Sequence, residues 1–577
     1  MNRQHRYRVI LRALQLGAVV ASASGAAWAG GPSPTEPPRE QFEAKGEVLV
    51  DFEDDVGESD LSLLFARLSA RATPTPLAAD TKSYVLDVAP ARVDELLREL
   101  GKDSRVEIVE PNHRVRALFV PDDPLLSEQW HLARVGAQRA WDFSTGRGVT
   151  VAVVDTGIAC QSFGPFTKAS DLSDTKCVAG FDFVNRRSDV ADDNGHGTHV
   201  AGTIAQSTNN GVGAAGLAFG ARLMPVKVLN AQGWGTFASV ADGIRFAANH
   251  HADVINLSLG GPFVSRAVEK AIRHARSKGV VVVAAAGNSG GAVEFPGRSE
   301  SAIGVSATDD ADHLARFSCR GEGVDLAAPG VGVLQQSVCD GGKNACELYP
   351  SWSGTSMAAP HVAGAAALLA SMGVTRPAAV ERILYATANS VDDREAAAGF
   401  GHGLLDVGAA VQRAALRKVL SRTLSLAVLI YVVFRGLRRR RAATASPWTP
   451  GFLFTALLTG PGLLFFAPFW LPRTGLAVDW LSRPLADWDL LLGTQLHAAL
   501  PLANVFVPLG ITLLLLGARG SRLPLAGLSL GTASYLFAEV LLQDLAFPLG
   551  AAAFTVWAGL NAVLCVLLAR LVLARAS

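Results

Sequence analysis

Through the middle of the chain, apolar runs rich in β-branched residues alternate with segments of helical periodicity. The runs are apolar at consecutive positions, a pattern typical of parallel strands that are buried on both faces. Strands are predicted near residues 149–154, 222–228, 253–257 and 280–286, and helices near 197–207, 236–249, 264–277 and 355–371. This alternation predicts an α/β domain in which helices cover both faces of a parallel sheet.

A smaller unit precedes this domain. Strands are predicted at 47–52, 83–88 and 106–112, and helices at 59–71 and 89–101. The first helix is predicted from the apolar positions Leu61, Leu64, Phe65 and Leu68, which share one side, and the second from its end at Gly101. The order strand, helix, strand, helix, strand predicts a small α+β sandwich.

The C-terminal region contains five long apolar runs. They lie near residues 419–434, 452–471, 496–517, 524–547 and 551–573. Each is close to the roughly 20 residues that span a bilayer, although polar residues interrupt the first. We therefore expect an all-α transmembrane bundle of about five helices, with four or six as alternatives. Glu539 and Asp544 lie in the fourth run, and such acids serve either a function in the membrane or contacts between helices.

The N-terminus has the pattern of a secretory signal peptide. Arginines in the first eight residues precede an apolar run at 9–23, and residues 27–29 (Ala-Trp-Ala) match a cleavage site. An uncleaved anchor is the alternative. Cleavage places the following domains outside the cytoplasm. The first span then leads inward, and the arginines at 438–441 lie inside, as the positive-inside rule expects.

Composition agrees with a membrane-bound protein. Of the 577 residues, 49% are apolar and 18% are charged, and the net charge is only +1. The length is too great for one hydrophobic core. From residue 415 onward there are 14 Lys and Arg but 5 Asp and Glu, and these positive charges mostly flank apolar runs. This distribution indicates membrane topology and gives no support for nucleic-acid binding.

Three residues stand where this fold presents reactive side chains. Ser356 begins a helical run, where backbone N–H groups favour developing negative charge. Asp155 ends the strand predicted at 149–154, and His196 lies between two glycines before a helix. Because functional groups gather at the carboxyl edge of a parallel sheet, these residues can serve as nucleophile, orienting acid and base of acyl transfer.

Ordinary interpretations of these positions must be weighed as well. Ser356 can be a simple helix N-cap. Asn288 follows the strand at 280–286 and can donate to an oxyanion, but Gly-Asn is also a common turn. His196 and His199 are three residues apart, yet no third ligand accompanies them at a familiar spacing, so we predict no metal there.

The motifs around Asp155, His196, Asn288 and Ser356, in this order along the chain, closely resemble those of the subtilisin-like serine proteases, the subtilases of peptidase family S8. The resemblance covers about residues 129–408. It implies a catalytic triad of Asp155, His196 and Ser356, with Asn288 in the oxyanion hole.

The same resemblance extends to substrate binding. Ser258-Leu259-Gly260 looks like the strand that pairs with extended substrate, although a plain strand end is the alternative. Gly287 is expected in the same cleft. The segment 327–330 (Ala-Ala-Pro-Gly) also matches the family and is interpreted as architecture.

The unit at 47–118 is similar to the inhibitory propeptide of subtilases, of the inhibitor I9 type. That similarity implies a folding chaperone that covers the cleft until it is cut away, and the alternative is an independent binding domain. We expect the cut between Leu118 and Gln129.

Calcium and the cysteines leave choices open. No cofactor is required, but the loop at 203–216 resembles one that often helps bind Ca²⁺ in relatives, although it lacks a carboxylate cluster. Asp193 is expected to hydrogen-bond locally beside His196. In an exported chain the disulfides Cys160–Cys177 and Cys339–Cys346 are reasonable pairings, which would leave Cys319 free, but spacing does not fix them.

Together these patterns predict five parts: a signal peptide (1–29), a linker (30–46), an inhibitory propeptide (47–118), a protease domain (119–410) and a transmembrane region (411–577). The expected function is a membrane-anchored serine endopeptidase facing the extracytoplasmic side, with polypeptide substrates, its own propeptide as inhibitor and the lipid bilayer as partners. One alternative is a transporter or sensor bundle with the protease as a processing module. Another, an inactive peptide-binding protease fold, has no need for all four site residues.

Overall fold

The computed structural model describes most of the chain. The described residues are 46–68, 70–113, 119–338, 349–391, 398–439, 446–470, 476–494, 497, 505–518, 520–547 and 549–574. The predicted signal peptide, nearly all of the linker and the pair Cys339–Cys346 lie outside these residues. The chain divides into two compact units that meet at residues 117 and 118.

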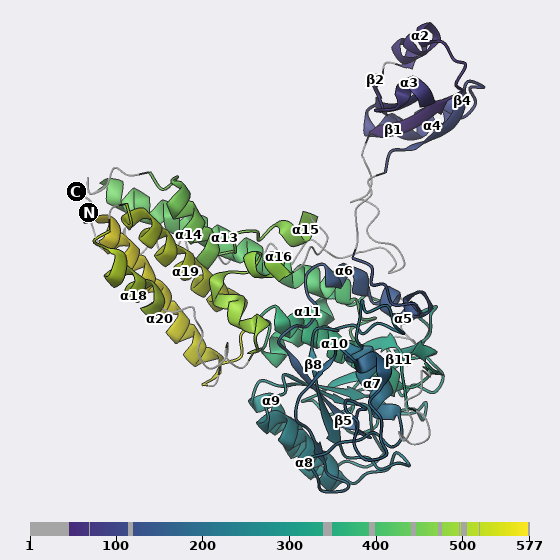
Figure 1. Cartoon of the computed structure of the whole chain (residues 1–577), viewed down its shortest axis with the longest axis vertical. Coiled ribbons are helices and arrows are strands. Elements are labelled where there is room, and N and C mark those ends of the chain that lie inside the picture. Colours follow the sequence, from purple (N-terminus) through teal and green to yellow (C-terminus); the bar gives the residue numbers. More distant parts are fainter. Residues whose placement is uncertain are drawn as a thin grey trace. The chain divides into compact units, whose positions relative to one another are not determined.

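The N-terminal unit is a four-stranded antiparallel sheet in the order β2-β3-β1-β4 with helices beside it (Figure 1). Its elements are β1 (Glu47–Phe52), α2 (Glu58–Leu68), β2 (Arg71–Pro74), α3 (Ala78–Thr81), β3 (Ser83–Asp87), α4 (Val93–Leu100) and β4 (Val106–Pro111). Alternate residues of β1 (Val48, Val50 and Phe52) are fully buried and pack against leucines of α2 and α4. The three predicted strands and two predicted helices are confirmed.

One boundary in this unit was predicted wrongly. The first helix was expected to reach Arg71 but ends at Leu68, and Arg71 begins the short strand β2. The strand pairs with β3 from Arg71 opposite Asp87 to Pro74 opposite Tyr84. The backbone hydrogen bonds of this pairing hold residues that local helical periodicity would have kept in the helix.

The second unit contains a parallel sheet in the order β12-β11-β10-β9-β5-β8-β6, with β7 also paired to β8. Its strands are β5 (Thr150–Asp155), β6 (Lys176–Cys177), β7 (Phe181–Asp182), β8 (Arg222–Lys227), β9 (Val254–Leu257), β10 (Val281–Ala285), β11 (Ile303–Thr308) and β12 (Leu326–Pro329). The helices are α5 (Trp130–Arg134), α6 (Ala137–Trp141), α7 (His196–Ala205), α8 (Phe237–Asn249), α9 (Arg266–Ser277), α10 (Thr355–Ser371) and α11 (Pro377–Thr387). The four strands and four helices predicted here are confirmed.

Helices cover both faces of this sheet (Figure 1). In β5, Val151 and Val153 face a core shared with α7, α10 and α11, whereas Ala152 and Val154 face a second core shared with α8 and α9. Successive strand residues point to opposite faces, so an unbroken apolar strand is the sequence signature of a sheet covered twice. A disulfide joins Cys160 and Cys177, and Cys319 and Cys565 are buried free thiols among the described residues.

The C-terminal part is helical and apolar. Its helices are α13 (Val407–Arg439), α14 (Pro450–Thr459), α15 (Ala467–Trp470), α16 (Leu476–Leu481), the 3-10 helix η6 (Leu485–Leu491), α18 (Phe506–Leu515), α19 (Arg522–Leu542) and α20 (Gly550–Ala574). Within the described residues, α13, α19 and α20 are long and apolar enough to cross a membrane. Among the described residues, the second predicted span contains the ten-residue helix α14 and the short helix α15, and the third contains the ten-residue helix α18, so neither holds a helix long enough to cross a membrane.

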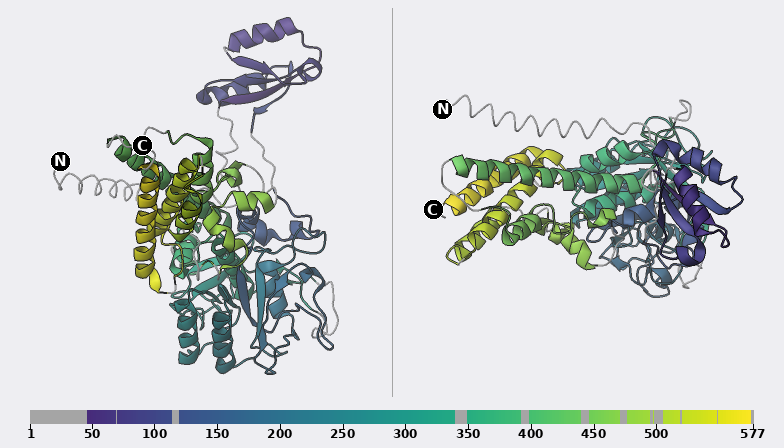
Figure 2. Two further views of the ribbon diagram at one scale, coloured as in Figure 1. Left: turned by 60° about the vertical axis from the view of Figure 1, so that its left-hand side comes forward. Right: turned by 90° about the horizontal axis from the view of Figure 1, so that it is seen from above.

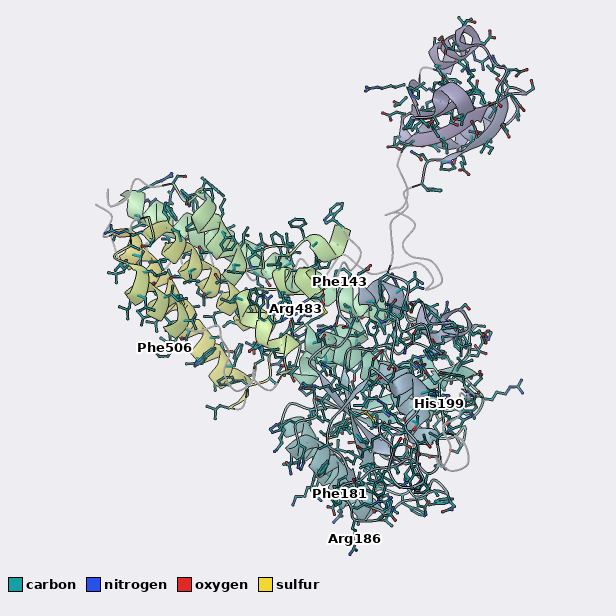
Figure 3. The ribbon with its side chains drawn as sticks, viewed as in Figure 1. Phe143, Phe181, Arg186, His199, Arg483 and Phe506 are labelled. Carbon is teal, nitrogen blue, oxygen red and sulfur yellow. A yellow bond between two sulfur atoms is a disulfide. The ribbon has the colours of Figure 1, made fainter. Side chains whose placement is uncertain are left out.

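Helix α13 links the two kinds of structure without a break (Figure 2). Its first turns, at Val407, Ala410 and Val411, are buried in the core shared with α10. Phe143 and Arg483 mark further contacts of the sheet domain with the C-terminal part (Figure 3): Phe143 packs edge-on against Phe469, and Arg483 donates to the Ser371 carbonyl.

A cluster of buried ion pairs holds the C-terminal helices together. Arg422 of α13 lies 2.9 Å from Asp487 of η6 and 2.8 Å from Glu539 of α19. Lys418, one turn earlier, lies 3.4 Å from Glu539, and the Tyr535 hydroxyl donates to Asp487 at 2.6 Å. The predicted intramembrane acid Glu539 therefore serves a contact between helices.

Candidate active site

Asp155 lies at the carboxyl end of β5 and is fully buried. Its Oδ1 accepts a hydrogen bond from the Thr156 backbone N–H and lies 2.7 Å from His196 Nδ1. The structure thus brings together two of the residues that the sequence predicted. A carboxylate in this place selects the His196 tautomer with a proton on Nδ1 and leaves Nε2 free to accept another.

His196 begins α7, and small residues allow its close approach to β5. A Cβ atom at Gly197 would lie 2.0 Å from the Gly157 carbonyl oxygen, so only glycine permits this contact. Burial, the largest influence, lowers the pKa of His196. The charge of Asp155 and its hydrogen bond, with a smaller contribution from Asp192, outweigh burial and raise that pKa.

The turn before His196 is organised by Asp192, a role that sequence reasoning assigned to its neighbour. Asp192 accepts hydrogen bonds from Gly195 N–H, Thr198 N–H and the hydroxyls of Thr156 and Thr198. Asp193, expected to bond beside His196, instead accepts from Lys227 Nζ at 2.6 Å. Both carboxylates support the loop, but Asp192 is the one tied to the start of α7.

Lys227, at the end of β8, was not identified from the sequence. Its side chain is fully buried, and Nζ donates to Asp193 and to the carbonyls of Thr156 and Leu229 at 2.6–2.8 Å. Three acceptors match the three donors of an ammonium group, which compensates for its removal from water. Lys227 therefore pins the loop that follows Asp155.

Ser356 lies in the first turn of α10, where backbone N–H groups are free. Pro360 has no N–H to donate to the carbonyl four residues earlier, which is that of Ser356. The Ser258 hydroxyl takes that role and donates to the Ser356 carbonyl at 2.8 Å. In return the Ser356 hydroxyl donates to the Ser258 carbonyl at 3.2 Å, and within the described structure it makes no hydrogen bond to His196.

Asn288 is oriented by the same helix terminus. Its Oδ1 accepts from the Thr355 backbone N–H and the Thr355 hydroxyl, both at 2.9 Å. A backbone N–H can only donate, so the atom that it meets must be the amide oxygen. The Nδ2 donor is thereby left for other partners, and Asn288 lines the cavity beside Ser356.

The segments that follow β9 and β10 and the start of α10 border an open cavity of about 350 Å³ beside Ser356. It is lined by Leu259, Gly260, Ala285, Gly287, Asn288, Ser289, Glu294, Thr355 and Ser356. The predicted cleft residues Leu259, Gly260 and Gly287 are among them, and Ser258 contacts Ser356 directly. Sequence reasoning missed Glu294, because no motif or periodicity connects it to Asn288, six residues earlier.

His199 takes no part in this cavity. Its Nε2 lies 3.1 Å and 3.2 Å from the carbonyls of Val333 and Pro350, and burial lowers its pKa to about 3. A neutral ring bonded to backbone is a structural histidine. No group of three or more His, Cys, Asp or Glu arranged to hold a metal ion occurs in the described ranges.

The loop at 209–213 is held by carboxylates from distant segments. Asp123 accepts from the Asn209 backbone N–H, Asp122 from that of Gly211, and Asp171 from Asn210 Nδ2. Burial raises the pKa of Asp171 to about 6. The carboxylates missing from the loop itself are thus supplied by the tertiary structure, and calcium binding stays a prediction.

Comparison with known proteins gives the class of this chain. Residues 146–403 match the Peptidase S8 subtilase family, and residues 35–112 match the fervidolysin N-terminal prodomain. The thermophilic serine proteinase of Bacillus sp. (strain AK1) is 40% identical over 332 residues, which cover 57% of this chain and 79% of that protein. The chain therefore belongs to the subtilase family. It is a subtilisin-like serine protease with an N-terminal prodomain.

Two further relatives cover similar parts of the chain. An extracellular protease of Xanthomonas campestris pv. campestris is 36% identical over 371 residues, covering 56% of this chain and 62% of that one. Among solved structures, a protease of Pseudoalteromonas arctica is 35% identical with a TM-score of 0.47, covering 51% of this chain and all of that one.

Proposed function

We propose that this subtilase is an exported, membrane-anchored endopeptidase that uses Asp155, His196 and Ser356 as its catalytic triad. The observation that carries the proposal is the 2.7 Å contact between Asp155, at the end of β5, and His196, together with the hydrogen bonds of Ser356 to Ser258, which follows the neighbouring strand β9. The division into a propeptide at 47–118, a protease domain at 119–410 and a membrane region at 411–577 is part of this proposal.

In the proposed reaction, His196 Nε2 takes the proton of the Ser356 hydroxyl while Oγ attacks the carbonyl carbon of the peptide bond. The resulting oxyanion accepts hydrogen bonds from the Ser356 backbone N–H and from Asn288 Nδ2. His196 then donates its proton to the leaving amine, and an acyl-enzyme remains. A water molecule then attacks the acyl-enzyme with His196 again as base, and the carboxylic acid product is released.

Two features prepare the site for this reaction. The hydrogen bond from the Ser356 hydroxyl to the Ser258 carbonyl is long, at 3.2 Å, and we expect the hydroxyl to exchange it for a bond to His196 when substrate binds. Residues 258–260 border the cavity, and we expect their backbone to pair with extended substrate by β-strand addition. Leu259, Gly260 and Gly287 would contact the substrate there.

Export and anchoring are supported by other observations. A related protease from Xanthomonas campestris is named extracellular, and three helices of this chain are long and apolar enough to span a bilayer. Under this proposal the arginines that end α13 lie in the cytoplasm, as the positive-inside rule expects, and the protease domain lies on the opposite side.

N-terminal sequencing of purified full-length enzyme beside Ser356→Ala tests the proposal. The sequence predicts the cut between Leu118 and Gln129. We expect wild type to be cut there or elsewhere between the end of β4 at Pro111 and the start of α5 at Trp130, and the variant to stay uncut. The variant should also lose about 10⁶-fold in kcat on peptide substrates, as when the nucleophile of other triads is removed. An uncut wild type, or equal cutting of both proteins, would contradict self-processing by Ser356.

A further inference from the structure

The cavity beside Ser356 contains one ionisable side chain. Of the nine described residues that line it, eight are glycines, apolar residues or neutral polar residues, and the ninth is Glu294. Its volume of about 350 Å³ is near the lower end of ligand pockets, which run from roughly 300 to 1,000 Å³. A space of this size suits one side chain of a substrate whose scissile bond lies at Ser356.

The position of the Glu294 carboxylate is set by the hydrogen bonds of its own backbone segment and by neighbouring glycines, which leave room for it. The Glu294 N–H donates to the Ala286 carbonyl at 2.8 Å, and Phe295 forms a β-bridge with Gly261. A Cβ atom at Gly287 would lie 2.6 Å from Glu294 Cδ, and one at Gly260 would lie 3.7 Å from Oε2. The carboxylate therefore lies between the two glycine-containing segments that border the cavity.

Glu294 has no ionic partner within the described structure. Its side chain is half-buried and takes part in no ion pair or hydrogen bond of the described residues. Nearby Arg298 instead donates to the Pro262 carbonyl at 3.3 Å. An apolar substrate side chain would remove water from this carboxylate without replacing the lost hydrogen bonds. An ammonium or guanidinium group would replace them with charge-assisted hydrogen bonds.

We infer that the cavity takes a lysine or arginine side chain at the residue before the scissile bond, with Glu294 as the specificity-determining carboxylate. This inference rests on the proposed function, because it assumes that Ser356 attacks the bond following that residue. The enzyme would then cleave after basic residues and reject acidic ones.

The chain itself offers such bonds. Arg114 and Arg116 lie between the last prodomain strand and the protease domain, and no lysine or arginine occurs between Leu118 and Gln129. Cleavage after a basic residue therefore places self-processing after Arg114 or Arg116. The mature N-terminus would be Val115 or Ala117, just before the window expected from the family resemblance.

The experiment compares peptide p-nitroanilides that differ only in the residue before the anilide: Arg, Lys, Leu or Glu. Full-length enzyme in detergent is assayed as wild type, Glu294→Gln and Glu294→Lys, and active sites are counted with a serine-directed phosphonate. We expect kcat/KM for Arg to exceed that for Leu by about tenfold or more in wild type. Because charge-assisted hydrogen bonds are lost, the Arg/Leu ratio should fall by about 10- to 100-fold in Glu294→Gln.

Glu300→Gln is the matched control, since it neutralises an exposed carboxylate on the same segment outside the cavity. It should keep the wild-type ratio, while Glu294→Lys should shift the preference toward Glu. A wild type that prefers Leu, with a ratio unchanged in Glu294→Gln, would overturn the inference and leave the catalytic proposal intact. Failure of wild type on every substrate, or equal rates in Ser356→Ala, would instead overturn the proposed function.

Discussion

Buried charges are held in different ways in the protease domain and in the C-terminal helices. Around the candidate active site, Lys227 and Asp192 are bonded largely to backbone carbonyls and N–H groups of loops. In the C-terminal part, Arg422 is paired with the side chains of Asp487 and Glu539. The first arrangement fixes loops at a sheet edge, and the second fixes one helix against another.

The difference depends on whether the local backbone has unpaired N–H and C=O groups. Strand ends and turns carry unpaired backbone groups, which can bind a buried ion. Within α13 and α19 the backbone N–H and C=O groups already bond to each other, so only side chains remain as partners. Changes in the first region should therefore act mainly on chemistry, and changes in the second mainly on stability.

The largest effect that tests this contrast is expected for Asp155→Asn. The amide keeps the size of the side chain but can hold the wrong His196 tautomer, as in other triads where this change lowers kcat by about 10⁴-fold. Assays of kcat on peptide substrates would measure it, with helical circular dichroism as the control for folding. If the variant lost as much free energy of unfolding as it lost in transition-state stabilisation, the change would not act mainly on chemistry, and the contrast between the two regions would fail.

The next effect is expected for Arg422→Leu, which leaves Asp487 and Glu539 buried without their main partner. Breaking a buried pair in this way costs about 3–5 kcal/mol, and the remaining contact of Lys418 with Glu539 favours the lower end. Thermal unfolding of the full-length protein in detergent measures the change.

Arg435→Leu is the matched control on the same helix. Arg435 is exposed and lies over the Tyr431 ring, so its loss should change stability by no more than about 0.5 kcal/mol. Equal unfolding temperatures for the two variants would show that the buried pairs do not hold the helices together.

The smallest effect is a shift in pH dependence. His196 must be neutral to accept the Ser356 proton, and its pKa is raised above 6.5, so kcat/KM should rise with pH through a value above 6.5. The ion pair with Asp155 has the opposite sign for stability, because its contribution is complete at low pH and is lost as pH rises through the raised pKa. Arg422→Leu should not shift this pH profile. A shift would show that the C-terminal helices influence the chemistry of the active site.

Sequence patterns predicted the protease domain more fully than the C-terminal helices. Unbroken apolar strands and helical spacing located β5, β8 and α10 because each is specified by local residues. In the C-terminal part, apolarity predicted spans but not where helices stop. In the second predicted span, for example, α14 ends at Thr459 before Gly460 and Pro461, and the next helix, α15, has only four residues.

Within the site, the residues in motifs were predictable and their supports were not. Asp155 and His196 stand in recognisable segments, whereas Lys227 reaches Asp193 from 34 residues away and Thr355 orients Asn288 from 67. Glu294 enters the cavity because Gly287 leaves room for it. Such contacts depend on tertiary packing, for which a single sequence taken by itself contains no signal.

The pairing of Arg422 also sets an order of events during synthesis. The N-terminal side of a chain leaves the ribosome first, and Glu539 follows Arg422 by 117 residues. When α13 emerges, Lys418 and Arg422 do not yet have Glu539 as a partner, and under the proposed anchoring these two charges would oppose its entry into lipid. Under the proposed anchoring, α13 would be held firmly in the bilayer only after α19 has arrived, and a chain that stops after Arg439 would lack that hold.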